Sequence, residues 1–212
     1  RDLVRSRGLG DVYKRQNMIR LGLNPDGTSN DVSNAIIGIS AAPSTETNLY
    51  FNSVFIGGTV TGTSATNTYC AQIDNSIKNI RNNIFFNARS NATTGGKHYS
   101  LRMANITGMV VDHNVYHVTG TNGVLANIVS ADKSSIEALR SATLQDGNSS
   151  VGDPKFINPT GTAALFDLHI DTAVETPVEG NGVAVAGYTN DYAVSYTQID
   201  PARRELGEDS GV

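Results

Sequence analysis

The sequence predicts an all-β chain: a fragment of a right-handed parallel β-helix of about four rungs, with one short helix near 135–142 and an irregular β closure at the C-terminus. Two series of short apolar segments recur along the chain at nearly constant spacing. The composition is rich in Asn, Thr, Gly and Ser, is 17% charged and contains no Trp. Short strands divided by many turns suit that composition better than helices do.

The first series consists of three segments that align without gaps at spacings of 30 and 31 residues: Tyr50–Gly57, Ile80–Asn87 and Val111–Val118. A fainter copy, Met18–Leu23, precedes them. Equivalent residues of successive rungs stack in a parallel sheet. The alignment therefore predicts three stacks: an aromatic one of Phe55, Phe85 and Tyr116, a polar ladder of Ser53, Asn83 and Asn114, and Arg81 beside Asp112 with Phe51 beneath.

The second series lies between the members of the first and comprises Ala35–Ile39, Tyr69–Ile73, Tyr99–Met103 and Val124–Ile128. Each repeat thus holds two short strands, and one rung cannot bury its apolar face alone. Stacking the rungs in parallel buries a continuous core. An antiparallel sandwich or jelly roll is the alternative, but it would not require the same residue types to recur at a fixed offset.

Beyond the rungs, Ser134 to Glu137 reads as a capping box in front of the short helix. We expect this helix where the regular repeat stops. Residues 17–150 are then the rungs with their helix, and 151–212 form a closing segment of the same domain. Cys70 has no partner for an intrachain disulfide and is expected to be a buried small apolar residue.

Residues 1–16 are expected to be non-native, because Ser6–Gln16 matches the translation of a transposase-type sequencing adapter. The native chain is expected to start near Asn17, in mid-gene, as part of a longer multidomain protein whose first rungs and signal peptide are missing. Residues that were never selected for this core should pack against nothing, and Leu9 and Val12 should lie outside it.

Charge and hydropathy exclude two classes of partner. Residues 1–16 hold five of the 16 basic and two of the 20 acidic residues, which leaves 11 basic and 18 acidic residues, a formal charge near −7. Nucleic acid would be repelled, and no basic stripe offsets this. No run approaches the roughly 18 apolar residues of a membrane span.

Several motifs in the same order resemble one family: Phe51–Gly58, Ile80–Arg89, Gly96–Tyr99, Gly152–Phe156, Asp167–Ile170, Thr176–Gly180 and Arg204–Asp209. They are similar to secreted bacterial right-handed β-helix proteins of the pectate-lyase-like superfamily, in particular surface proteins exported with a C-terminal sorting domain. Ser210 stands where the second acid of the family's closing motif would be. The resemblance implies a secreted or cell-surface location but no activity, since fold alone does not give function.

An enzyme of this superfamily would cleave polysaccharides, as a lyase that uses calcium or as a glycoside hydrolase. The candidate residues are Asp74, Lys78, Arg81 and Asp112. They are scattered single charges, whereas a lyase site needs several carboxylates beside a base. A stacked ion pair explains Arg81 and Asp112 equally well. His113 and His117 share a spacing that metal ligands could have, but no third ligand follows, so no metal site is expected.

The function that we expect is therefore an extracellular or cell-surface scaffold that binds carbohydrate or acts as an adhesin. The candidate ligand-binding residues are Lys97, His98, Tyr99 and Arg102, which follow the turn at Gly95 and Gly96. A solvated turn is the alternative explanation for them. We expect a monomer whose partner is a polysaccharide or cell-surface glycan, with no cofactor. The alternative function is the polysaccharide lyase or hydrolase, with calcium if it is a lyase.

Overall fold

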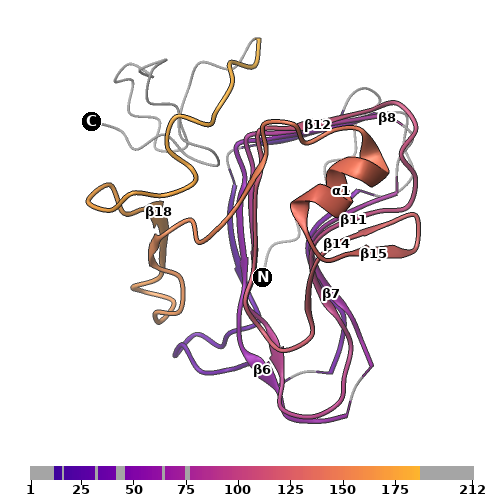
Figure 1. Ribbon diagram of the computed structural model, residues 1–212. Helices are drawn as coiled ribbons and strands as arrows, with labels where there is room; N and C mark the ends of the chain where they lie inside the picture. The colour runs from indigo at the N-terminus through magenta and orange to yellow at the C-terminus, as the bar shows by residue number, and fades with distance from the viewer. Residues whose placement is uncertain are drawn as a thin grey trace.

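The chain forms a parallel β-solenoid of about four turns, as a computed structural model shows (Figure 1). The structure describes residues 12–15, 17–31, 33–41, 46–63, 65–74 and 77–186; of residues 12–15, 46, 77 and 78 it describes the backbone alone. The view in Figure 1 runs along the solenoid, so that strands of successive turns overlie one another. The predicted fold class is confirmed.

Three sheets form the walls. Sheet one contains β1 (Val12–Arg15), β4 (Glu46–Tyr50), β8 (Ile77–Arg81) and β12 (Met109–Asp112). Sheet two contains β2 (Met18–Leu21), β5 (Ser53–Ile56), β9 (Ile84–Asn87), β13 (Val115–Val118) and β16 (Ser150–Val151). Sheet three contains β3 (Ile36–Ala41), β7 (Thr68–Ile73), β11 (His98–Met103), β14 (Gly123–Ile128) and β15 (Ala131–Lys133). All neighbouring strands in these sheets are parallel except β14 and β15.

Two small strand pairs lie outside these walls. At the turn between sheets two and three, β6 (Thr59–Val60) pairs with β10 (Ser90–Asn91). Near the C-terminus, β17 (Phe156–Asn158) pairs antiparallel with β18 (Asp167–Ile170).

The core lies inside the solenoid because side chains alternate across each strand. Every wall contributes at least one buried apolar ladder: Leu49, Ile80 and Val111 from sheet one, Val54, Phe85 and Tyr116 from sheet two, and Ala71, Leu101 and Ala126 from sheet three. Cys70 is fully buried in the same core, as predicted. The core is thus continuous from turn to turn.

A sharp corner joins sheet one to sheet two at the same place in each turn. Phe51, Asn82 and His113 have φ of 55°, 57° and 53°, which is the left-handed region that L-residues seldom adopt. Each is followed by a fully buried Asn, namely Asn52, Asn83 and Asn114. The Asn83 side chain accepts from the backbone N–H of Asn52 at 3.1 Å, and that of Asn114 accepts from the N–H of Asn83 at 3.0 Å. This asparagine ladder stabilises the corner.

The predicted stacks between the second and third segments are confirmed, and those that involve the first segment are wrong by one residue. Phe85 and Tyr116 stack with ring centroids 6.1 Å apart. Asn52 stands in the ladder where Ser53 was predicted, Val54 pairs with Phe85 where Phe55 was predicted, and Tyr50 pairs with Arg81 where Phe51 was predicted. The spacing is 31 residues in both steps, and a shift of one residue moves a side chain to the opposite face. Phe55 therefore faces outward and contacts Phe86 at 5.1 Å.

The second series has the predicted register in its last three members, in which Tyr69, Tyr99 and Val124 are neighbours. The first member was misplaced by two residues, because Ile37 rather than Ala35 pairs with Tyr69.

Helix α1 (Ile136–Thr143) covers the C-terminal end of the solenoid, where the repeat stops (Figure 1). Its N-cap is Ser135, whose side chain accepts from the backbone N–H of Ala138 at 3.2 Å. The capping residue thus follows the predicted Ser134 by one position. Leu139 is fully buried in the main core, and Ile136 packs against that core. The helix protects apolar side chains that a further turn would otherwise cover.

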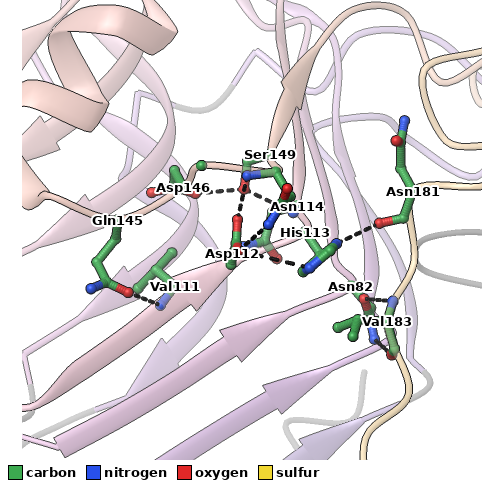
Figure 2. Close-up of polar contacts among 12 residues, drawn as sticks. Asn82, Val111, Asp112, His113, Asn114, Gln145, Asp146, Ser149, Asn181 and Val183 are labelled. Atoms are coloured by element: carbon green, nitrogen blue, oxygen red, sulfur yellow. Dashed lines mark hydrogen bonds and ion pairs between the residues drawn. The ribbon is translucent and has the colours of Figure 1, made fainter.

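Beneath this end lies a buried carboxyl group, that of Asp146 (Figure 2). Its Oδ1 accepts from the Tyr116 hydroxyl at 2.8 Å and the Ser149 hydroxyl at 2.7 Å, while Oδ2 has no partner among the described residues. Burial raises the pKa of Asp146 to about 6, against the lowering effect of the Ser149 and Tyr116 hydrogen bonds.

We expect Asp146→Asn to remove a pH dependence of stability. The native state holds the Asp146 proton more tightly than the unfolded state, so the stabilisation is complete below the unfolded pKa and is lost as pH rises through 6. Relative to the wild type, the free energy of unfolding of the variant should increase by about 2 kcal/mol between pH 4 and pH 7. Urea unfolding at several pH values measures this gain, and a constant difference between the two proteins would contradict the raised pKa.

One prediction about residues 1–16 is wrong. Val12–Arg15 form β1, which pairs in parallel with β4, from Val12 beside Thr47 to Arg15 beside Tyr50. The exposed edge of β4 offers unpaired N–H and C=O groups that a neighbouring extended segment can satisfy, whatever its origin. Leu9 and the side chain of Val12 lie outside the described part of the chain.

The segment after β16 folds back over the outer face of sheet two (Figure 1). Phe156, Leu168, Ile170 and Val178 form a second apolar cluster with Phe55, Ile84 and Val115. Arg20 of β2 donates to the carbonyl of Pro159 at 3.2 Å. Further along, the side chain of Asn82 donates to the carbonyl of Val183 at 2.7 Å and accepts from its N–H at 2.9 Å. The described part of 151–186 thus covers one wall of the solenoid.

Candidate functional site

The outer face of sheet three carries a group of polar and aromatic side chains, here called the tyrosine face: Asn67, Tyr69, Gln72, Asp74, Lys97, Tyr99, Arg102, Asn127 and Asp132. Alternation places them, because Leu101 and Met103 of β11 point into the core and Arg102 between them points out. Gln72, Arg102 and Asn127 are neighbours across three strands. The segment 151–186 covers the outer face of sheet two and lies on the opposite side of the solenoid from the tyrosine face (Figure 1).

Two stacked tyrosines form the centre of the face. The rings of Tyr69 and Tyr99 are 5.3 Å apart and within 7° of parallel. The guanidinium of Arg102 lies 6.0 Å from the centre of the Tyr69 ring, at the limit for a cation–π contact. The Tyr69 hydroxyl accepts from the side chain of Asn67 at 3.2 Å. Tyr69 is partly exposed, whereas Tyr99 beside it is buried.

Asp132 binds three neighbours at one edge of the face. Its carboxylate accepts from the Tyr99 hydroxyl and from the side chain of Asn127, both at 2.9 Å, and forms an ion pair with Lys97. Burial and the Asp132 carboxylate raise the pKa of the Tyr99 phenol. The phenol therefore stays protonated and donates a hydrogen bond to Asp132. Strand β15 supplies Asp132 by turning back beside β14.

The second ion pair joins Arg102 to Asp74 at 2.5 Å, and Gln72 donates to the same carboxylate at 3.2 Å. The side chains of Arg102 and Asp74 are each 27% exposed, and that of Lys97 is 53% exposed. The face therefore presents two cations and two anions in pairs, with amide groups between them. Its net charge is zero, although it offers many hydrogen-bonding groups.

No family model, curated protein or solved structure matches the chain. Among the described residues, no helix is long and apolar enough to cross a membrane.

Of the four predicted ligand-binding residues, the structure brings Lys97, Tyr99 and Arg102 together on the tyrosine face. His98 points into the solenoid, is fully buried, and lies 2.9 Å from the Thr68 hydroxyl through Nδ1. Burial, and then the charge of Arg89, lower the pKa of His98 to about 4, so its ring is neutral at pH 7. The prediction that His98 is exposed in a turn is wrong, because β11 begins at this residue and faces it inward.

The four catalytic candidates do not converge. Asp74 belongs to the tyrosine face, whereas Arg81 and Asp112 end neighbouring strands of sheet one. The side chain of Lys78 lies outside the described part of the chain.

Arg81 and Asp112 are register partners, as predicted, but no ion pair joins them. The Asp112 carboxylate instead accepts from the backbone N–H and the side chain of Asn148, at 2.7 and 2.8 Å. The segment that follows α1 thus supplies its partner, and the predicted ion pair is wrong.

The two histidines considered as metal ligands lie on different elements. His113 is the left-handed corner residue, and its Nδ1 contacts the carbonyl of Asn181 at 2.8 Å (Figure 2). His117 lies in β13 with its ring 4.5 Å from that of Phe86. Within the described ranges, no three His, Cys, Asp or Glu side chains are grouped to hold a metal ion.

Sequence reasoning proposed Asp74 only as a catalytic candidate and missed Asn67, Tyr69, Gln72, Asn127 and Asp132 of the tyrosine face. Tyr69 could have been predicted beside Tyr99, because the two tyrosines occupy the same position in the second series. Asp132 could not have been predicted, since its position depends on an antiparallel strand outside the repeat.

Proposed function

We propose that the chain is an extracellular or cell-surface scaffold that binds a glycan on the tyrosine face. The observation that carries the proposal is the stacked pair of Tyr69 and Tyr99 beside outward-facing Arg102, Gln72 and Asn127. A sugar presents hydroxyl groups and an apolar C–H face, and these match such a mixture of amide, guanidinium and aromatic groups. The resemblance to pectate-lyase-like surface proteins supports the location.

The charge balance favours a neutral glycan over a polyuronate. Lys97 and Arg102 are each paired with a carboxylate, so a polyanion would have to displace Asp132 or Asp74. The chain carries a formal charge of −4, which would repel a polyanion further. A neutral chain can use the exposed donors and acceptors without breaking either ion pair.

Binding without cleavage is the proposed activity. The candidates for cleavage lie on two different sheets, and a lyase or hydrolase needs its acid and base within hydrogen-bond reach of one substrate bond. In the described part of the chain, no contact between these candidates supports the lyase or hydrolase function.

We expect Tyr69→Ala and Arg102→Gln to weaken binding of a neutral polysaccharide at least about tenfold, as truncation of a central contact commonly does. Affinity electrophoresis against a panel of neutral and acidic polysaccharides measures this. Phe166→Ala is the matched control, because Phe166 is 38% exposed on the segment that covers sheet two. Equal retardation of all four proteins, or a preference for polyuronates, would contradict the proposal.

A further inference from the structure

A second candidate site lies on the opposite side of the molecule from the tyrosine face. Where the segment 151–186 crosses sheet two, it leaves a hollow of about 330 Å³. Phe86, Phe156 and Val174 supply apolar lining, and Asp153, Lys155 and Asp171 supply charge. This volume is at the lower end of the range for small-molecule sites, which fits a single sugar ring better than an extended chain.

The apolar side of the hollow is built from aromatic rings. The rings of Phe86 and Phe156 are 6.4 Å apart and inclined by 27°. Phe86 is also fixed from behind by Phe55 and from the side by His117, at 5.1 and 4.5 Å. These contacts hold an apolar surface at the hollow before any ligand arrives. Binding therefore costs little side-chain entropy.

The charged side carries one negative charge in excess. Lys155 is paired with Asp153, to which it donates from both Nζ and its backbone N–H at 2.9 Å. Asp171 accepts from the backbone N–H of Ala173 at 3.0 Å, and no ion pair joins it to a described residue. Burial lowers the pKa of the nearby His117, which is therefore neutral at pH 7 and adds no positive charge.

We propose that this hollow binds an amino sugar with a free ammonium group. The sugar ring lies against Phe86 and Phe156, and the ammonium pairs with the carboxylate of Asp171. A lysine side chain offers the same charge, but it would lose the rotamer freedom of a long flexible stem on binding. A pyranose ring is already rigid and presents C–H groups to the aromatic surface. A uronate would be repelled by Asp171.

The test is calorimetric titration of the whole chain at slightly acid pH with glucosamine, N-acetylglucosamine, glucuronate and lysine methyl ester. We expect glucosamine to bind at least tenfold more tightly than the other three. Asp171→Asn should abolish this preference while keeping the Oδ1 acceptor for Ala173. Asp167→Asn is the control, since Asp167 begins β18, directly after which Asp171 lies, but does not line the hollow.

Equal binding of N-acetylglucosamine would overturn the ammonium contact, and equal binding of the lysine ester would show a site for cationic side chains. Unchanged glucosamine binding by Asp171→Asn would show that Asp171 does not bind the ammonium and would overturn the proposal. Tyr69→Ala should leave glucosamine binding unaltered, so that failure here is distinguishable from failure of the tyrosine face.

Discussion

We expect Asn83→Leu to destabilise the solenoid by about 3–5 kcal/mol, because it leaves several buried polar groups without partners at once. The Asn83 side chain accepts from the N–H and the side chain of Asn52, at 3.1 and 2.8 Å. It also donates to the carbonyls of Leu49 and Arg81, at 3.0 and 2.9 Å. Leucine has a similar size but can satisfy none of these groups.

Urea unfolding followed by circular dichroism measures the loss. Asn127→Leu is the matched control, because Asn127 also lies at a repeat position but faces outward and contacts Asp132. It should cost no more than about 1 kcal/mol. If both substitutions had the same small effect, the asparagine ladder would not be a stabilising element of the corner.

A comparable effect is expected from Arg89→Met, about 3–4 kcal/mol, since hydrogen bonds to a charged group are among the stronger ones. Arg89 is fully buried at the turn between sheets two and three. Its guanidinium donates to the carbonyls of Gly57 at 3.0 Å and Asn30 at 2.9 Å, which belong to earlier turns of the solenoid. Methionine keeps an unbranched apolar stem but is shorter and donates nothing.

Thermal unfolding of Arg89→Met and Lys97→Met separates a buried cation from an exposed one. The ion pair of Lys97 is solvent-exposed, and such pairs contribute about 0–1 kcal/mol. A melting temperature for Arg89→Met as high as that of Lys97→Met would show that the hydrogen bonds from Arg89 to the carbonyls of Gly57 and Asn30 do not stabilise the solenoid.

The parallel fold could be predicted because recurrence at a fixed spacing is visible in a single sequence. The register of the first turn could not be predicted from residue type alone: aligning Phe55 with Phe85 looks better than aligning it with Phe86, yet the second choice is correct. The asparagines resolve the ambiguity, since each step from Asn52 to Asn83 and from Asn83 to Asn114 is 31 residues. A buried polar side chain that must satisfy the backbone is a stricter marker of register than an aromatic one.

The candidate site was only partly predictable, for a related reason. Lys97, Tyr99 and Arg102 come from one segment, and their residue types suggested binding. Alternation within β11 then decided which side chains face solvent, and it placed His98 inside. Asp132 and Asn148 lie beyond the repeated segments, and the path of the chain after its last turn brings them to Tyr99 and Asp112. Such contacts cannot be predicted from a repeat.

The most direct test of glycan binding on the tyrosine face is to map backbone amide chemical shifts by NMR during titration with a neutral oligosaccharide. The oligosaccharide is taken from a polysaccharide that retards the protein in affinity electrophoresis. We expect the largest shifts in β7, β11 and β14, at Tyr69, Arg102 and Asn127, with little change in sheet one at Asn79 and Val110. Shifts confined to sheet one or to residues 153–174 would contradict it.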